Sequence, residues 1–312
     1  MNPQIYNLPR IRDAIARYDR DVKAANTTSG TIKTSLLNEV VTTFLQDQLA
    51  PLQAFSLDVL PDPIKPLAVV VSKRVTAGGT AASAVTDFEN ETTMVATAGA
   101  ISVTPLQYTA GGHLTNAELN SGYRMTDWSV IKASEIANAI WDVVAALLTE
   151  GNFPATPHVS AAPMFGGADL QTLWGRLQKA PTKNLVCDGA WFAHLLAKSA
   201  IDFNTASGDV RTLRWPGWGT IGYSSRWSAA GPGVVGIAGA QSCLRIVAGV
   251  PLSPPSAAAA GLNQSTVQLP LGLQCQVNQW FDTGARTDWA TFDMVFGAAV
   301  DDGTAGILIR GS

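Results

Sequence analysis

The stretch that decides the fold runs from residue 67 to residue 150. LAVVVSKRV (67–75) is rich in β-branched residues, as strands are, and leads into TAGGTAASAVTDFENETT (76–93). In that second segment 12 of 18 residues are Gly, Ala, Ser or Thr. A further extended stretch, MVATAGAISVTPLQYTAGGHLT (94–115), then returns. The pattern predicts a long hairpin whose tip has too few large apolar residues for a core of its own, which favours assembly over catalysis.

The segment TDWSVIKASEIANAIWDVVAALLTE (126–150) predicts one long amphipathic helix. Thr126 is a good N-cap, and Gly151 followed by Pro154 is a typical stop. At 1.5 Å per residue, a helix over 127–150 is about 36 Å long. Its apolar face is made of Val130, Ile136, Ala137, Ile140, Val143, Val144, Leu147 and Leu148.

Charge is sparse and unevenly placed. Charged residues make up 14% of the 312-residue chain, against about 25% in typical soluble domains, which favours a subunit with large interfaces over a well-buried monomer. Residues 1–33 carry six basic and three acidic residues, a balance of +3, whereas the tip (76–93) carries three acidic residues and no basic one. We predict that residues 1–33, the charged part of an N-terminal arm, and the tip (76–93) contact other subunits. The alternative is that both segments are simply solvated. The candidates are Arg10, Arg12, Arg17, Arg20 and Lys23 in the arm, and Asp87, Phe88, Glu89 and Glu91 in the tip.

Several classes of protein fit the composition poorly. No stretch approaches the roughly 20 apolar residues of a membrane span. The three cysteines, Cys187, Cys243 and Cys275, are far apart and odd in number, which predicts buried free thiols in a reducing compartment. A net charge of −3 argues against a dedicated nucleic-acid binder.

The remaining elements follow from local patterns. Short helices are predicted at 10–25 and from about 35 to just before Pro51. Downstream, helices at 169–180 and 189–200 alternate with a strand at 183–188, and strands follow around 218–225, 233–239 and 244–249. Residues 253–265 read as a loop, and the end of the chain as two long strands joined by a turn at 282–287.

Two constellations could carry chemistry. GPGVVG (231–236) matches a dinucleotide-binding pattern, but no acidic residue lies between Asp209 and Asp282, so we interpret it as a turn that enters a strand. The same acid-free stretch interleaves basic and aromatic residues, which favours an interface or internal packing over nucleic-acid binding, with Trp215 and Trp218 as inter-subunit candidates. Its members are Arg211, Arg214, Trp215, Trp218, Arg226, Trp227 and Arg245. The histidines are isolated and no nucleophile or metal motif occurs, so we predict no catalytic, cofactor or metal residues.

The order of elements resembles the major capsid protein of tailed phages, the Hong Kong 97 fold. ISVTPLQYTAGGHLTNAELNSG (101–122) and the following helix are similar to the strand-to-spine region of that family. KNLVCDGAWFAHLL (183–196) and VVGIAGAQSCLRIVAGVPLSP (234–254) resemble its axial-domain units, and FDMVFGAAVDDGTAGILI (292–309) its C-terminal strand and tail.

The resemblance implies an α+β chain with an N-terminal arm (1–63), an extended loop (64–98), a peripheral domain (99–165) with its spine helix at 127–150, an axial α/β domain (166–266) and C-terminal strands that return to the peripheral domain (267–312). It further implies hexamers and pentamers that form an icosahedral shell around double-stranded DNA, contacted non-specifically. Portal, scaffolding and decoration proteins would be partners, and no membrane would be. The protein would be located in the virion, and the capsid would be assembled in the cytoplasm of the host bacterium. The tip has no lysine, the nearest being Lys73, so the covalent crosslinks of some members are not expected. The alternatives are an encapsulin-type nanocompartment shell of the same fold and, from another class, an α/β enzyme.

Overall fold

The computed structural model describes residues 38, 41–42, 44–45, 48–60, 69–76, 97–115, 125–178, 180–198, 212–213, 215–252, 262–282, 284 and 287–312. Residues 1–33 of the predicted arm and all but the first residue of the predicted tip lie outside these residues. The arm and tip candidates therefore keep the status of predictions. They are Arg10, Arg12, Arg17, Arg20, Lys23, Asp87, Phe88, Glu89 and Glu91.

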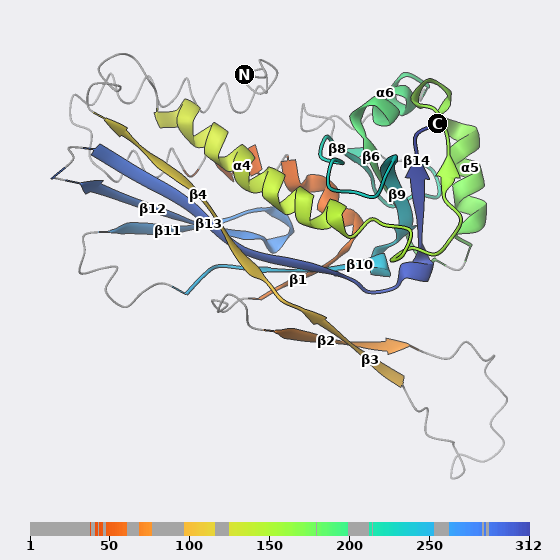
Figure 1. The fold of residues 1–312 in the computed structure, drawn as a ribbon, viewed down its shortest axis with the longest axis horizontal. Coiled ribbons are helices and arrows are strands. Elements are labelled where there is room, and N and C mark those ends of the chain that lie inside the picture. Colours follow the sequence, from red (N-terminus) through yellow and green to blue (C-terminus); the bar gives the residue numbers. More distant parts are fainter. Residues whose placement is uncertain are drawn as a thin grey trace, which may run out of the picture.

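A six-stranded sheet is organised around its longest strand, β13 (Thr287–Val300). One edge of β13 pairs with β4 (Leu106–Thr115). Residues 287–293 also pair with β12 (Gln274–Asp282), and residues 295–300 pair with β10 (Leu244–Gly249). Because β4 pairs with residues 287–296 of β13 along one edge, β12 and β10 must both lie along the other edge of β13. There β12 and β10 follow one another end to end. Strands β11 (Asn263–Gln268) and β1 (Ser56–Val59) extend the sheet beyond β12 and β10 (Figure 1).

Helix α4 (Met125–Ala146) covers one face of this sheet and confirms the predicted long helix. It ends four residues earlier than predicted, because Leu147 and Leu148 turn more tightly and donate to the carbonyls of Val144 and Ala145. The Asn152 side chain then donates to the carbonyl of Leu147 at 2.7 Å. These bonds satisfy carbonyls that the end of a helix leaves open.

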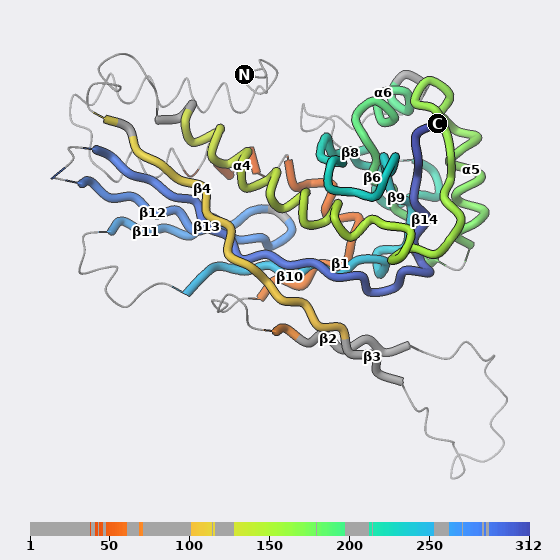
Figure 2. Tube along the Cα trace, viewed as in Figure 1, coloured from red at the N-terminus to blue at the C-terminus, as the bar shows by residue number. Residues whose placement is uncertain are grey.

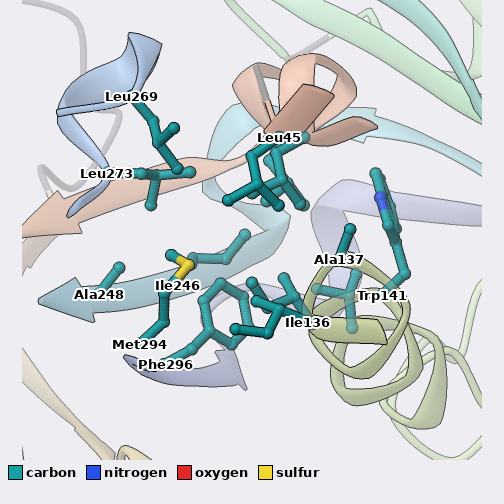
Figure 3. Close-up of a cluster of buried hydrophobic side chains, with 14 of the residues drawn as sticks. Leu45, Ile136, Ala137, Trp141, Ile246, Ala248, Leu269, Leu273, Met294 and Phe296 are labelled. Atoms are coloured by element: carbon teal, nitrogen blue, oxygen red, sulfur yellow. The ribbon is translucent and has the colours of Figure 1, made fainter. Parts of the chain in front are cut away.

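The core between α4 and the sheet is built from alternate residues of the strands. Figure 3 shows Ile136 of α4 beside Met294 and Phe296 of β13, and Leu45, one of the described helical residues before η2, completes the cluster. Trp141 lies at the same junction and donates its indole N–H to the carbonyl of Gln48 at 3.0 Å. Burial of these large apolar side chains is the main stabilising term for this half of the molecule. Two short 3-10 segments border it, η2 (Ala50–Ala54) and η6 (Pro270–Gly272).

A second six-stranded sheet forms the other half of the described chain. Its order is β5 (His158–Val159), β14 (Gly306–Arg310), β9 (Val234–Ala240), β6 (Lys183–Asp188), β8 (Ile221–Ser224) and β7 (Thr212–Leu213). Helices α5 (Gly167–Arg176) and α6 (Gly189–Lys198) and the 3-10 segment η4 (Ala162–Met164) lie beside it. Its separate core is centred on Phe165, Leu185, Phe192 and Leu195. The predicted strands at 183–188, 218–225 and 233–239 and the helices that begin near 169 and 189 are confirmed.

The chain passes between the two sheets three times, and the second and third crossings correct the predicted ranges (Figure 2). β10 falls within the predicted axial range (166–266), yet it pairs with β13 of the larger sheet, because η5 (Gln241–Cys243) separates it from β9. β14 falls within the range predicted to return to the peripheral domain (267–312), yet it pairs with β9 after η7 (Gly303–Ala305). β11 also begins inside the predicted loop 253–265. The sequence of an apolar strand shows that the strand is buried, but it does not show which sheet the strand joins.

The predicted hairpin is present as β2 (Val70–Thr76) paired with β3 (Thr97–Val103) in a separate two-stranded sheet. It lies to one side of the larger sheet, and only Thr104 and Pro105 separate β3 from β4 (Figure 1). No helix among the described residues has the length and apolar character needed to cross a membrane.

Candidate assembly surface

The base of the hairpin packs on the face of the larger sheet that is opposite α4. Val103 is buried against Val247 and Val295, and Val70 and Ile101 pack on the same small cluster. Val295 lies between Met294 and Phe296, whose side chains point to the α4 core, so it points the other way. The hairpin is therefore fixed at its base, on the face that α4 leaves uncovered.

Further along the same face lies a polar network centred on Asp293, whose residue is only 5% exposed. Its Oδ1 accepts a hydrogen bond from Thr109 Oγ1 at 2.5 Å, and its Oδ2 accepts one from Asn278 Nδ2 at 2.6 Å. Thr291 Oγ1 donates to Oδ2 at 3.2 Å, and Gln107 Nε2 lies 3.5 Å from Oδ1. The carboxylate is thus satisfied by neutral donors from its own strand and from the two neighbouring strands β4 and β12, as a buried charge requires.

The network extends to the fourth strand. Gln264 of β11 donates to Asn278 Oδ1 at 2.8 Å, so hydrogen bonds cross β11, β12, β13 and β4 in series. Sequence reasoning missed this feature, although β12 carries its signal. QCQVNQW places Gln274, Gln276, Asn278 and Trp280 at every second position, which marks one polar face of a strand.

An aromatic row lies on this face near the turn between β12 and β13. His113, Trp289 and Trp280 are direct cross-strand neighbours on three adjacent strands. The two indole rings are stacked with their centroids 5.6 Å apart, and the His113 ring lies 4.5 Å from that of Trp289. Such cross-strand pairs stabilise the register of a sheet.

Strand β4 borders this face. Leu106, Gln107, Thr109 and His113 are exposed, and the strand contains no charged residue. Gly111 is required by space, since a Cβ there would come within 2.5 Å of Thr291 Cγ2. The β4 backbone therefore lies close against β13 along its inner edge.

Several of the interleaved arginines and tryptophans that the structure describes make contacts within the chain. Trp218 is buried in the core of the second sheet, and Trp215 packs on that core. Of the two interpretations, an interface or internal packing, internal packing therefore accounts for Trp218. Arg226 forms two hydrogen bonds to Asp142 of α4, at 3.1 and 2.5 Å. The side-chain hydrogen bond to Asp142 is the main reason that the pKa of Arg226 is raised. The inter-subunit roles of Trp215 and Trp218 remain predictions, and Arg211 and Arg214 lie outside the described residues.

Arg245 is also held within the chain. Its guanidinium donates to Asp58 at 2.8 Å and to Asp301 at 3.2 and 3.1 Å. Burial is the largest influence and lowers its pKa, but the hydrogen bonds to both carboxylates outweigh burial and raise it. The residue joins β1, β10 and the segment after β13.

Neither of the sequence motifs for chemistry leads to a catalytic site among the described residues. GPGVVG forms a turn that enters β9, as predicted, with Gly233 at a φ of 71°. The thiols of Cys187, Cys243 and Cys275 are free and buried, and burial raises the pKa of each. Within the described ranges, no group of three or more His, Cys, Asp or Glu residues is placed to hold a metal ion.

Comparison with known proteins gives similar structures but no similar sequence. No family model and no curated protein matches the chain. The mature capsid of bacteriophage PhiM1 is 12% identical, with a TM-score of 0.48 over 83% of this chain and 86% of that one. The capsid of cyanophage P-SCSP1u is 11% identical, with a TM-score of 0.47 over 83% and 86% of the two chains. A virus-like particle from Pyrococcus furiosus is 12% identical, with a TM-score of 0.47 over 87% and 98%. Two of these three similar structures are phage capsids.

Proposed function

We propose that this chain is the structural subunit of an icosahedral phage head. It assembles with copies of itself into hexamers and pentamers, and these close into a shell around double-stranded DNA. The observation that carries the proposal is the hairpin β2–β3, which pairs with no other described strand and packs on the body through Val70, Ile101 and Val103 at its base. An isolated two-stranded hairpin is marginally stable in water, so a partner surface is needed to hold it.

The charge distribution supports contacts between copies. The arm at 1–33 has a balance of +3 and the tip at 76–93 a balance of −3, so the two attract each other across a subunit boundary. Among the described cations, Arg226, Arg245, Lys132 and Arg310 each form an ion pair within the chain. Arg176 and Lys183 donate to backbone carbonyls of the same chain. Contact with packaged DNA is accordingly non-specific and weak. Portal, scaffolding and decoration proteins are the further partners, and assembly takes place in the host bacterial cytoplasm before the protein resides in the virion.

Two variants test the assembly elements. Removal of residues 1–33 is expected to abolish or loosen shells, and truncated protein that still forms shells of normal size and stability would contradict the role of the arm. Reversal of Asp87, Glu89 and Glu91 to lysine is expected to lower the disassembly temperature at low salt, where charge interactions are least screened. An unchanged disassembly temperature would contradict the proposed attraction between residues 1–33 and the acidic tip.

The absorbance ratio of purified shells separates this function from a nanocompartment of the same fold. A phage head that has packaged its genome contains nucleic acid, whereas a nanocompartment contains protein.

A further inference from the structure

One continuous segment, residues 48–60, touches both halves of the described molecule, and we call it the strap. Its second part, β1, pairs in parallel with β10 and so belongs to the larger sheet. Its first part, η2, contacts β6 and β8 of the second sheet (Figure 1). In the sequence the strap lies between the charged residues 1–33 and the hairpin β2–β3. It therefore connects both proposed assembly elements to the junction between the two halves.

Apolar packing holds the strap against both halves. Leu52 and Phe55 of the strap are buried in the same cluster as Val186 of β6 and Ile246 of β10. Hydrophobic burial is non-directional, so it presses the two halves together without selecting one angle between them. A directional contact is needed to select that angle.

Asn184 of β6 supplies such a contact. It is only 5% exposed and lies on the same face of β6 as Val186, toward the strap. Its Nδ2 donates to the carbonyl of Ala54 at 2.9 Å, and its Oδ1 accepts a hydrogen bond from the backbone N–H of Thr220 at 2.8 Å. One amide thus ties the end of η2 to two segments of the second sheet. Satisfied polar networks inside a core rigidify it and specify one arrangement.

Other side-chain links between the halves are partly exposed to solvent. They include Arg226–Asp142, Arg310–Glu150 and the hydrogen bond from Gln241 Nε2 to the carbonyl of Phe55 at 3.3 Å. Exposed ion pairs contribute little to stability, whereas buried polar groups that lose their partner are costly. Asn184 is therefore the side chain whose loss should most affect the angle between the halves.

We propose that Asn184 fixes the angle between the two halves of the subunit and, through that angle, the diameter of the shell. The inference rests on the proposed function and names the residue that controls the curvature of the assembly. Both halves belong to a subunit that is repeated in every position of a symmetric shell. A change of angle within one copy is consequently repeated in all copies, and it alters the curvature at which the shell closes.

The angle is tested in unassembled subunits by pulsed electron paramagnetic resonance. Spin labels at Glu135→Cys in α4 and Gln171→Cys in α5, both exposed positions, report the distance between the halves. The natural cysteines are buried, so labelling is confined to the two introduced thiols. Asn184→Leu removes both hydrogen bonds and is expected to broaden the distance distribution about twofold or more, because no directional contact then selects one arrangement.

Asn278→Leu is the matched control. Asn278 is also a buried amide, 7% exposed, but it hydrogen-bonds within the larger sheet, to Gln264 and Asp293. This variant should lose stability and keep the narrow distance distribution of the parent. Where Asn184→Leu does not fold, Asn184→Asp keeps the test decisive. In mildly alkaline solution its ionised carboxylate retains the acceptor for Thr220 and lacks the donor to Ala54.

Electron microscopy of the assembled variants then tests the link to diameter. Asn184→Leu shells should vary in diameter, whereas parent and Asn278→Leu shells should be uniform. If the parent forms no shells, the proposed function fails, and the distances in the subunits still test the angle.

Shells of parent diameter with an unchanged distance distribution would overturn the role of Asn184 and leave the proposed function intact. A broadened distribution with shells of unchanged diameter would overturn the link from angle to diameter. Equal broadening in Asn278→Leu would assign the effect to a general loss of stability and would also overturn the inference.

Discussion

The ion-pair centre at Arg245 gives the sharpest test of how the described chain is held together. The Asp301 side chain is 0% exposed, the Arg245 side chain 16% and the Asp58 side chain 36%. Substitution Arg245→Met keeps most of the volume of the side chain but leaves the buried carboxylate of Asp301 without the guanidinium. Breaking a buried pair in this way costs about 3–5 kcal/mol. Because Asp58 is more than a third exposed, Asp58→Asn should cost under about 1 kcal/mol.

Urea unfolding of the unassembled subunit, followed by circular dichroism, measures these losses. Lys132→Met is the matched control, since the Lys132–Glu135 pair at 2.8 Å is exposed and contributes about 0.3–0.5 kcal/mol at most. The double variant Arg245→Met with Asp301→Asn should lose less than Arg245→Met alone, because no charge remains buried. If Arg245→Met costs no more than Lys132→Met, the reasoning about this centre is wrong.

Three further predictions concern packing, the polar network and the thiols. Gly111→Ala should destabilise the subunit by about 1–3 kcal/mol, because the added Cβ would clash with β13. Gly112→Ala is the control and should cost clearly less, since its Cβ would meet its nearest atom at 3.4 Å. Equal losses of stability in urea unfolding would refute the clash. Asp293→Asn places an amide N–H against donors and should cost about 1–3 kcal/mol, so an unchanged unfolding midpoint would contradict the network. Burial raises the pKa of Cys243 and Cys275 to about 12, above the ordinary value of 9.0. The thiols ionise at a lower pH in the unfolded chain than in the folded one, so their contribution to the free energy of unfolding should be fully present below pH 9 and should decrease as the pH rises toward 12. If a variant with alanine at both positions shows the same decrease in alkaline solution, this explanation is refuted.

Local signals predicted the elements well. The apolar period located α4, and the β-branched run at 69–71 located β2. Those features act within a few residues of one another, so the sequence displays them directly. The predicted N-cap was wrong, because α4 begins at Met125 and Thr126 lies inside the helix. The end of α4 could not be read in the same way, because it depends on the Asn152 side chain reaching back to Leu147.

Pairing between distant segments was the part that could not be predicted. β10 and β14 are similar short apolar strands, yet one joins the larger sheet and the other the second sheet. The Asp293 network joins four strands, and its partners lie up to 186 residues apart in the sequence, between Gln107 and Asp293. Only the fold brings those donors together, although the alternation in β12 marks one of its faces as polar.

Electron microscopy of the purified full-length chain in negative stain tests the central claim most directly. The account predicts closed shells of uniform diameter that contain nucleic acid once DNA has been packaged. Monomers or small open oligomers, seen in the micrographs and confirmed by sedimentation over a range of salt and protein concentrations, would contradict it.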